Sequence, residues 1–368
     1  MKISVLTGRY ALSGVPLAQM RFSRALARAG HNVDFLIGLV NACGMPPAPQ
    51  NVRTIVLGKA RVSSMLVPLV RYLKHHKPDV VFSAGDHLNA IVMLAAILAG
   101  SRAKISCSSR VTPFDTYSRV LLSKGWVLKW VMRAVMWRAD VLTCVSRDMV
   151  LQYRQVIPNA PHRCIYNIVD DQQSRQRMME SVDDPWLLER IGPILVAAGT
   201  LEPWKGFGDL IRAMSLVPVE IGARLLVLGD GSLRDELRAL IDKLGLQERV
   251  KLVGYVDNPL KYFKNASVFV LSSHVEGLPN VLVEAMMCGC TPVATDCPTG
   301  PREVLQNGKV GYLVPVGDEV AMAGAIVQAI NAPTAVADLK EAIRPFSEKN
   351  VLMQHFALLG IPSQYEGE

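Results

Sequence analysis

The chain has 368 residues, of which 50% are hydrophobic and 20% are charged, with 40 Lys and Arg against 32 Asp and Glu. This length exceeds that of a usual single domain and predicts two domains, and the apolar content excludes a disordered or fibrous chain. The seven Cys are scattered without a C-x-x-C pair, which favours reduced thiols in a cytosolic compartment.

Strand-like apolar runs alternate with helical runs along the whole chain, which predicts α/β domains with parallel sheets. In the first half, strands are expected at 3–6, 33–37, 80–83, 105–108 and 141–145, and helices at 16–29 and 88–98. The half closes at residues 165–167, so we expect an N-terminal domain over residues 1–170.

Residues 171–192 are polar and have no apolar periodicity, so they are expected to form a linker. The alternation then restarts, with strands expected at 193–199, 224–228, 250–253, 268–271, 292–295 and 310–314, and helices at 207–216 and 233–244. We expect a second domain over 193–343 and a final segment, 344–368, that packs back on the first domain. Two successive open α/β units of similar size predict a ligand-binding cleft between them.

Charge is divided unevenly between the two halves. Residues 1–170 carry 22 basic and 7 acidic side chains (net +15), whereas residues 171–368 carry 18 and 25 (net −7). The first half is therefore expected to meet nucleic acid, an anionic bilayer or a phosphorylated substrate. Residues 119–138 hold five of the basic side chains and three of the five Trp, which is typical of an interfacial helix. A core helix with outward-pointing basic side chains fits the same composition.

No membrane-spanning helix is expected. The longest apolar run, at 90–100, is too short to cross a bilayer. The first apolar stretch is short and soon turns polar, so it predicts a first β-strand and not a secretory signal.

Residues 272–289 carry the strongest indication of chemistry. A helix is expected at 279–288, with Pro279 at its first position and a glycine after its end. Glu284 lies in the apolar interior of this helix and is expected to need a partner, either a protein cation or adjacent ligand hydroxyls such as those of a ribose. Gly277 permits close backbone approach, and the amides of the first helical turn attract phosphate, with Glu276 in the loop ahead of them. A capped core helix with an internally paired Glu284 fits the spacing equally well.

A second cluster, at 199–207, follows the first strand of the second half and opens a helix. Lys205 in this cluster is well placed to meet a diphosphate at the carboxyl end of the strand. A lone Lys at such a position is usually a solvated surface residue, but together with residues 272–289 it favours a ligand.

Glu276 and Glu284 form an E-x7-E pattern, and the chain resembles the retaining glycosyltransferases of family 4, which have the GT-B architecture. The surroundings that also match are Gly199 with Lys205-Gly206-Phe207, the run 228–234, Val253-Gly254-Tyr255 and the run 276–285. The run 296–303 resembles the subgroup that adds N-acetylgalactosamine, galactose or related sugars to lipid-linked glycans. In the first half the resemblance is weaker and rests on Ser13-Gly14, Ser109-Arg110 and Tyr166-Asn167. The implied fold is two Rossmann-like α/β domains that face each other across a cleft.

The resemblance also implies a role for individual residues. Glu284 would hold the donor ribose, Glu276 would face the transferred sugar, and Lys205 would hold the diphosphate together with the backbone of Gly277, Leu278, Asn280 and Val281. Gly14 would let a loop of the first half close on the phosphates, and the loop at Gly254-Tyr255 would flank the base. Asp86 or His87 would approach the sugar from the acceptor side, although an Asp-His pair is more often only part of a turn.

The implied activity is transfer of a hexose or N-acetylhexosamine, with retention, from a nucleotide sugar, expected to be a UDP-sugar, to a polyprenyl-diphosphate or other lipid-linked glycan. The nucleotide sugar is a substrate, so no cofactor is expected, and the enzyme would work at the inner face of the cytoplasmic membrane, on an anionic surface that meets its basic first half. The chain contains no Asp-x-Asp triplet and no clustered ligand spacing, so no metal is expected. Thr200 stands where the family usually has Arg, and this change removes a bidentate phosphate clamp that Lys cannot replace.

Other functions fit parts of the same pattern. An epimerase or phosphorylase would share the architecture, and a GDP-mannose-dependent transferase would share the chemistry. A non-catalytic scaffold that binds nucleotide sugar is supported by Thr200. A nucleic-acid-binding protein is suggested by a pI near 9.1. It is disfavoured because the second half is acidic and no zinc-finger or RNA-recognition motif is present.

Overall fold

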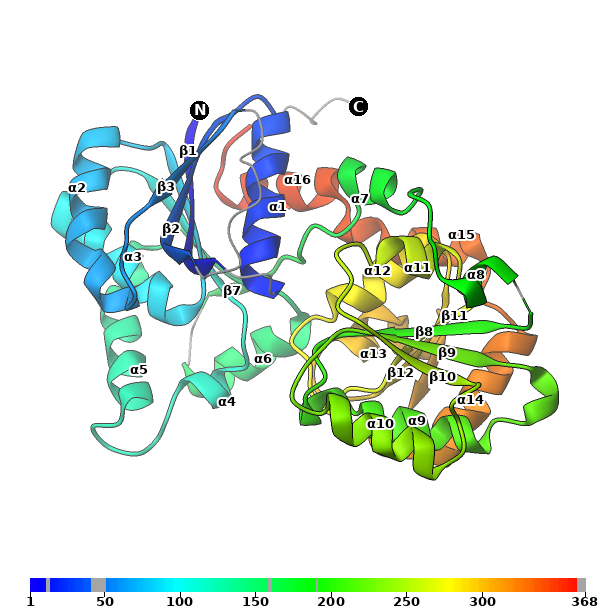
Figure 1. Cartoon of the computed structure of the whole chain (residues 1–368). Coiled ribbons are helices and arrows are strands. Elements are labelled where there is room, and N and C mark those ends of the chain that lie inside the picture. Colours follow the sequence, from blue (N-terminus) through cyan, green and yellow to red (C-terminus); the bar gives the residue numbers. More distant parts are fainter. Residues whose placement is uncertain (11–13, 41–50, 158–160, 190, 363–368) are drawn as a thin grey trace. The chain divides into compact units, whose positions relative to one another are not determined.

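The computed structural model describes residues 1–10, 14–40, 51–157, 161–189 and 191–362, and the chain divides into two compact units (Figure 1). Unit 1 consists of Met1–Ile168 and Glu348–Glu368, and unit 2 consists of Val169–Ser347. The chain therefore leaves unit 1 close to the expected end of the first domain, and it returns to unit 1 four residues after the expected position 344.

Unit 1 is built on a seven-stranded parallel sheet in the order β3-β2-β1-β4-β5-β6-β7. Its strands are β1 (Lys2–Tyr10), β2 (Asn32–Val40), β3 (Val52–Val56), β4 (Val80–Ala84), β5 (Lys104–Ser109), β6 (Val141–Cys144) and β7 (His162–Cys164). Its helices are α1 (Gly14–Arg28), α2 (Leu66–His76), α3 (Asp86–Ala99), α4 (Pro113–Thr116), α5 (Lys124–Val135), α6 (Arg147–Val156) and α16 (Glu348–Leu358). In Figure 1, α2 and α3 lie on one face of this sheet, and α1 and α16 lie on the other.

The core of unit 1 joins the first helix of the chain to the last. On α1, Phe22 is buried, and its ring packs at 5.0 Å from that of His355 on α16. The His355 ring also meets Phe82 of β4 at 5.3 Å. Leu352 and Phe356 extend this contact into the apolar cluster under the sheet. The C-terminal helix is thus a structural part of unit 1.

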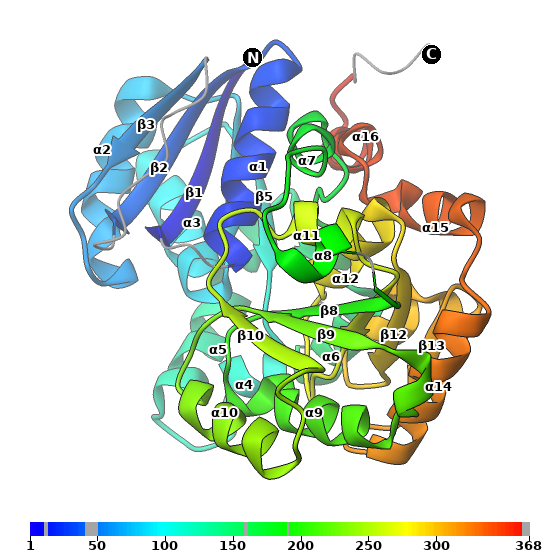
Figure 2. The same ribbon diagram turned by 45° about the vertical axis from the view of Figure 1, so that its right-hand side comes forward.

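Unit 2 is built on a six-stranded parallel sheet in the order β10-β9-β8-β11-β12-β13. Its strands are β8 (Ile194–Ala198), β9 (Arg224–Leu228), β10 (Val250–Gly254), β11 (Val268–Leu271), β12 (Thr291–Thr295) and β13 (Tyr312–Val314). Its helices are α7 (Gln172–Arg177), α8 (Pro185–Glu189), α9 (Phe207–Leu216), α10 (Arg234–Lys243), α11 (Leu260–Lys264), α12 (Asn280–Cys288), α13 (Pro301–Val304), α14 (Glu319–Asn331) and α15 (Val336–Ile343). Figure 2 shows α9, α10 and α14 along one face of the sheet and α11, α12 and α15 along the other.

Residues 171–192, expected to be a linker, instead carry the two short helices α7 and α8 and belong to unit 2. The Lys251 ammonium holds the buried carboxylate of Asp184 at 2.8 Å, and the Asn258 side chain donates to the Arg177 carbonyl oxygen at 2.8 Å. Polar bonds to the body of unit 2 therefore fix this segment, together with a few buried side chains such as Leu187. Because such anchors leave no apolar periodicity, the sequence pattern did not indicate them.

Among the described residues, no single helix has both the length and the apolar composition needed to cross a bilayer. One pair of segments, 319–331 and 336–346, meets that composition only when the two are taken together across a bend of 116°.

Candidate active site

The candidate donor residues gather at the carboxyl edge of the unit 2 sheet, where the strand order reverses between β8 and β11. Lys205 lies in a single 3-10 turn (Pro203–Lys205) after β8, and Glu276 lies in the loop after β11. In open α/β sheets, ligands bind at such a reversal because the loops on either side diverge and leave a crevice. The topology therefore brings together two residues that are 71 positions apart in the chain.

Lys205 and Glu276 form an ion pair in which Nζ lies 2.6 Å from Oε1. Their side chains are only 20% and 11% exposed. The Ser273 hydroxyl donates to the same carboxylate oxygen, also at 2.6 Å. A hydrogen bond between charged groups that are largely withdrawn from water is strong, so the pair fixes both side chains at the edge of the sheet. The sequence indicated Lys205 and Glu276, but not Ser273.

A strap formed by residues 295–300, which begins at the last residue of β12, holds the Glu276 loop by its backbone. The Glu276 N–H donates to the Pro298 carbonyl oxygen at 2.9 Å, and the Thr299 N–H donates to the Glu276 carbonyl oxygen at 3.0 Å. The Thr299 hydroxyl lies 2.8 Å from the carbonyl oxygens of both Glu276 and Gly277. A Cβ on Gly300 would lie 2.7 Å from Pro279, so this close approach requires glycine. Thr299 is thus a positioning residue that the sequence pattern did not reveal.

Helix α12 begins at Asn280, with Pro279 as its N-cap residue, one position later than expected. It buries Leu282, Val283 and Met286, which explains the apolar pattern, and Glu284 is half-buried. The Asn280 N–H donates to the Leu278 carbonyl oxygen at 2.9 Å, so this one of the predicted phosphate donors is already engaged within the turn.

The remaining donor candidates lie on neighbouring loops at the same edge. Gly254 ends β10 with a φ of 92°, and its carbonyl oxygen accepts from Gly229 N–H at 2.8 Å. Tyr255 follows it and is exposed, as a residue that flanks a ligand must be. Thr200, at the position where the family usually has Arg, is exposed in the loop after β8. These loops lie along the same edge as the Lys205–Glu276 pair but at least one strand away from Glu276.

The sequence analysis did not identify a second polar cluster, which lies beside Lys205. The His274 ring nitrogen Nε2 lies 2.6 Å from a carboxylate oxygen of Asp209 on α9, and the Arg212 guanidinium contacts the other oxygen at 2.6 Å. The His274 N–H donates to the Trp204 carbonyl oxygen at 2.8 Å. These contacts tie the loop after β11 to the turn that carries Lys205.

In unit 1, the two residues expected to approach the sugar have different environments. His87 is exposed in the first turn of α3. Asp86 is only 5% exposed, and its carboxylate accepts hydrogen bonds at 2.5 Å from both the Ser109 and the Tyr153 hydroxyls. Burial raises the pKa of this carboxyl group, although these hydrogen bonds oppose the rise. Asp86 therefore joins the start of α3 to β5 and α6 from the inside, and of the two residues only His87 is presented to solvent. Gly14 is exposed at the start of α1.

Arg110 follows β5 at the carboxyl edge of the unit 1 sheet. Its guanidinium contacts the side-chain oxygens of Asn167 and Gln19, which are both neutral. Among the described residues its Nε has no hydrogen-bond partner, and the two side chains that its guanidinium contacts carry no charge. Burial lowers the pKa of Arg110 to about 10. Within the described residues, the hydrogen-bond partners of this guanidinium therefore leave its charge unneutralised.

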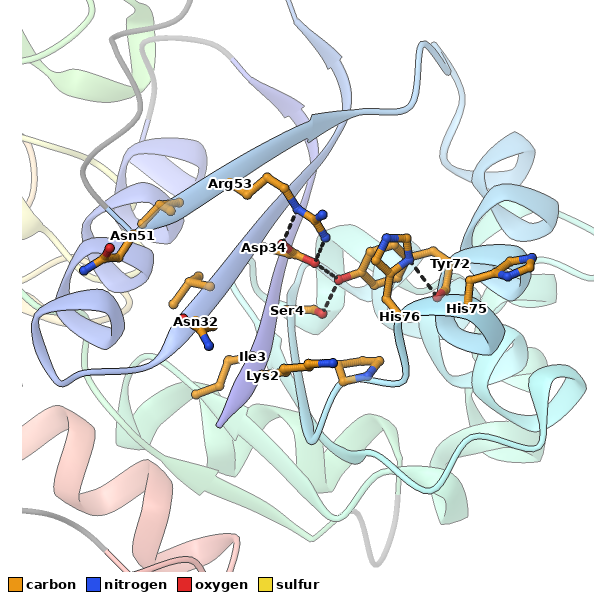
Figure 3. Close-up of a pocket in the computed structure, with 13 residues that line it drawn as sticks. Lys2, Ile3, Ser4, Asn32, Asp34, Asn51, Arg53, Tyr72, His75 and His76 are labelled. Carbon is orange, nitrogen blue, oxygen red and sulfur yellow. Dashed lines mark hydrogen bonds and ion pairs between the residues drawn. The ribbon is translucent and has the colours of Figure 1, made fainter.

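The opposite, amino edge of the unit 1 sheet holds a hollow of about 600 Å³ (Figure 3). At its floor, the Asp34 carboxylate accepts two hydrogen bonds from Arg53, at 2.7 and 2.6 Å, and one from the Tyr72 hydroxyl at 2.5 Å. Burial opposes ionisation of Asp34, but these bonds outweigh it and lower the carboxyl pKa. None of the residues predicted for the donor or acceptor lines this hollow, so it is not a candidate for the reaction.

Among the described residues, no group of three or more His, Cys, Asp or Glu side chains is placed to hold a metal ion.

The chain matches two family descriptions, one for each half. Residues 183–346 match "Glycosyl transferases group 1", and residues 13–173 match "Glycosyltransferase Family 4". A relative from Campylobacter jejuni, N-acetylgalactosamine-N,N'-diacetylbacillosaminyl-diphospho-undecaprenol 4-alpha-N-acetylgalactosaminyltransferase, is 30% identical over 248 residues. The match covers 66% of this chain and 65% of the relative, which is just under two thirds of its length.

Two solved structures are similar over nearly the whole chain. The lipopolysaccharide outer core galactosyltransferase WaaB, in its apo form, gives a TM-score of 0.75 at 19% identity and covers 98% of this chain and 99% of its own. Anabaena HepE in complex with UDP and glucose gives a TM-score of 0.74 at 20% identity, with the same coverage. At these identities the likeness establishes the fold.

Proposed function

Since the chain belongs to family 4 of the glycosyltransferases, which have the GT-B architecture, we propose that it is a retaining enzyme that moves a hexose or N-acetylhexosamine from a nucleotide sugar to a lipid-linked saccharide. The observation that carries this proposal is the pairing of Lys205 with Glu276 at the reversal of the unit 2 sheet. An ammonium group and the start of a helix supply positive potential at the place where an α/β sheet binds its ligand.

The difficult step in the proposed reaction is cleavage of the bond between the anomeric carbon and the donor phosphate. The electron pair of that bond leaves with the diphosphate, so negative charge grows on the phosphate oxygens. Lys205 and the positive end of the α12 dipole stabilise that charge, and they do so without reorganisation because Ser273 and the strap 295–300 already fix their surroundings.

The acceptor hydroxyl oxygen forms the new bond to the anomeric carbon on the face that the diphosphate leaves. Its proton passes to an oxygen of the leaving phosphate, so no base of the protein is consumed, and the configuration is retained. In this scheme Glu276, held by Lys205, faces the transferred sugar, and Glu284 accepts hydrogen bonds from the ribose. No metal ion enters the scheme, because the protein's own cations and amides meet the phosphates.

The proposed donor is a UDP-sugar. Support comes from the HepE structure, a complex with UDP and glucose that has the same fold. Thr200 removes one phosphate clamp that the family usually provides, so the proposed enzyme depends more strongly on Lys205 than its relatives do.

The proposed acceptor is a glycan on a polyprenyl diphosphate, as the name of the Campylobacter relative states for that enzyme. Arg110 supports this proposal, because its guanidinium has only neutral partners and can therefore meet an acceptor diphosphate without first breaking an ion pair. The net charge of +15 on residues 1–170 favours an anionic membrane surface, and we place the reaction at the inner face of the cytoplasmic membrane.

Thermal unfolding in the presence of UDP-, GDP- and ADP-sugars tests the donor. We expect UDP-sugars to raise the melting temperature and the others to leave it unchanged. A rise with GDP-mannose alone would make GDP-mannose the donor in place of a UDP-sugar. A melting temperature that no nucleotide sugar raises would contradict the proposal.

A transfer assay with a short-chain polyprenyl-diphosphate saccharide tests the reaction itself. The expected product carries the anomeric configuration of the donor, as read by NMR of the new glycosidic bond. Inversion would refute the proposed mechanism. Binding of the donor without product would favour the non-catalytic scaffold, and an epimerised donor in the absence of acceptor would favour an epimerase.

A further inference from the structure

The loop that leads into α5 presents large apolar side chains to solvent. Val120, Leu121 and Leu122 are 69%, 68% and 76% exposed, which makes them three consecutive exposed apolar residues. Single exposed apolar residues are common on protein surfaces, but a contiguous exposed group of this kind marks a site of interaction.

The backbone holds this loop in a defined shape. The Val120 N–H donates to the Ser118 hydroxyl at 3.0 Å, and the Ser123 N–H donates to the Val120 carbonyl oxygen at 3.2 Å. A Cβ on Gly125 would lie 2.8 Å from the Ser118 backbone nitrogen, so the base of the loop closes tightly on itself. Leu122 adopts a left-handed φ of 61°, a conformation that costs free energy for a residue with a side chain. The four residues 119–122 are thus held at the tip of a fixed turn.

Helix α5 continues the exposed apolar surface and adds aromatic rings to it. The helix packs on α3 through Leu128, Met132 and Val135. Its outer side exposes Trp130 by 49%, and Trp137 in the turn that follows is 70% exposed. In Figure 1 the loop and α5 lie along an outer edge of unit 1. Trp is enriched where proteins meet the boundary between lipid headgroups and acyl chains, because its ring is apolar and its N–H is polar.

The charges on this surface have one sign. Arg119, Lys124, Lys129 and Arg133 lie between residues 119 and 133, and no Asp or Glu occurs from 116 to 139. The Arg133 guanidinium lies 5.1 Å from the centre of the Trp130 ring, so charge and aromatic surface are adjacent. An apolar tip flanked by basic residues complements a bilayer of anionic lipids, whereas an acidic protein partner would leave the three apolar side chains without apolar contacts.

We propose that residues 119–137, the membrane-docking surface, seat unit 1 on an anionic bilayer, with Val120, Leu121 and Leu122 inserted below the headgroups and the basic side chains at the level of the phosphates. The choice of a bilayer as partner rests on the proposed function, since an acceptor carried on a polyprenyl chain lies in a membrane. The docking itself needs neither donor nor acceptor, so it can be measured separately from the reaction.

Sedimentation of the full chain with vesicles of phosphatidylglycerol and phosphatidylcholine (1:1) tests the proposal, without any nucleotide sugar. We expect the triple variant Val120→Ser, Leu121→Ser, Leu122→Ser to bind these vesicles at least about tenfold more weakly than the wild type, because the buried apolar area is lost. The matched control is Val320→Ser with Val336→Ser, two exposed valines of unit 2, which should bind as the wild type does. Binding that is unchanged in the triple variant would overturn the proposal.

Charge reversal tests the second half of the surface. Lys124→Glu with Arg133→Glu should weaken binding by at least about 25-fold, since each basic residue near an anionic surface strengthens binding about fivefold. Arg238→Glu with Lys309→Glu, on exposed positions of unit 2, changes the net charge equally and should have a much smaller effect. Equal losses in the two double variants would show attraction by net charge alone and would contradict a defined surface.

Tryptophan fluorescence of the wild type gives a readout that does not depend on any variant. Vesicles that carry a quencher at shallow depth on the acyl chain should quench Trp emission, and Trp137→Phe should remove a large part of that quenching. Sedimentation velocity distinguishes a second copy of the chain as the occupant. A dimer that the triple serine variant converts to a monomer, with vesicle binding unchanged, would assign this face to self-association and overturn membrane docking.

Discussion

Lys205 is the residue on which the proposed chemistry depends most, because Thr200 offers no guanidinium and the Asn280 amide is already engaged. Its ammonium has an internal partner in Glu276, and that carboxylate is also held by Ser273. A phosphate that approaches Lys205 therefore shares the ammonium group with Glu276, and the position of that group is already set. The ion pair orients the side chain before any donor arrives, and it also limits the positive charge that the donor meets.

We expect Lys205→Ala to lower kcat/KM for the donor about 100-fold or more, the usual effect of removing one group that stabilises a leaving charge. Lys205→Arg should restore only part of the activity, because a planar guanidinium does not occupy the place of the ammonium. Steady-state kinetics with a UDP-sugar and a lipid-linked acceptor make the measurement. Lys309→Ala, an exposed lysine of unit 2, serves as the control and should retain full activity. A Lys205→Ala enzyme with the wild-type kcat/KM would show that this lysine is only a partner for Glu276.

Two buried histidines of unit 1 make the fold sensitive to acid. Burial lowers the pKa of His355 to about 3, with a smaller contribution from Arg110, and burial lowers the pKa of His162 to about 4. The unfolded chain binds a proton at each near pH 6.5, whereas the folded chain does not. The stability that depends on these two groups is therefore fully present above pH 6.5. As the pH falls from 6.5 toward 4, each group lowers the free energy of unfolding by about 1.4 kcal/mol per pH unit.

His355→Leu should remove one of these two pH-dependent contributions to stability, because leucine takes up no proton in the folded or the unfolded chain. We expect the free energy of unfolding to fall less steeply between pH 6 and pH 5 in this variant, by about 1.4 kcal/mol per pH unit. Urea unfolding followed by circular dichroism at pH 7, 6 and 5 measures the slope. His75→Leu, at an exposed position of α2, is the control. Equal slopes in His355→Leu and the wild type would mean that His355 takes up its proton in the folded protein.

At the scale of secondary structure, the sequence predicted elements that bury a continuous apolar side and missed those fixed by polar contacts. The apolar run of α12 and the proline before it indicated a helix within one residue of its start. The strap 295–300 and helices α7 and α8 are held by side chains such as Thr299 and Asp184, whose partners are distant in the chain. Edge strand β3 also escaped notice, since its burial is incomplete. Pattern rules read local spacing, and these contacts are not local.

Local patterns also explain which residues of the candidate site the sequence indicated and which it missed. The sequence indicated Lys205, Glu276 and Glu284 as candidates because they stand out within local patterns, and in the structure the sheet reversal brings Lys205 to Glu276. Ser273 and His274 were not assigned roles, although they directly follow β11, and a polar residue at that position is the signal that indicates them. For Asp86, the sequence pattern indicated the residue but not its burial, because its partners Ser109 and Tyr153 come from other elements.

The turn that carries Lys205 depends on one close backbone approach. Gly206 adopts a φ of 63°, and a Cβ there would lie 2.1 Å from the Ser272 carbonyl oxygen. Gly245 has a similar φ of 66° with open space around it. Gly245→Ala should therefore cost only the strain of a left-handed alanine, about 1 kcal/mol. We expect Gly206→Ala to cost clearly more and also to weaken UDP binding, because the turn must move away from β11.

Melting temperatures of the two alanine variants and calorimetric titration with UDP measure these effects. The comparison isolates the contact with Ser272, since both variants carry the same backbone strain. If Gly206→Ala and Gly245→Ala lose equal stability and bind UDP alike, the approach of the turn to β11 does not position Lys205.

In the whole molecule, basic and acidic residues are divided unequally between the two units. The residues proposed for the different ligands are divided between the units along the same line. Unit 1 has 23 basic and 9 acidic residues, and unit 2 has 17 and 23. The acidic unit carries the Lys205–Glu276 pair proposed for the donor, whereas the basic unit carries Arg110 and the membrane-docking surface. Under the proposed function, a few fixed groups on unit 2 would recognise the anionic donor, and the broad positive field of unit 1 would attract the acceptor and the bilayer.

Hydrogen–deuterium exchange tests this division, because it reads each segment of the chain separately. UDP should slow amide exchange in peptides that cover 199–206 and 272–300, where the donor residues and their strap lie. Peptides of β3 and α2, which border the hollow in Figure 3, should exchange at the same rate with and without UDP. Anionic vesicles without UDP should slow exchange at 118–137 and leave 272–300 unchanged. Lys205→Ala should abolish the first effect and keep the second, whereas the triple serine variant at Val120, Leu121 and Leu122 should do the reverse. Protection by UDP at 118–137, or by vesicles at 272–300, would contradict the assignment of donor and membrane to separate units.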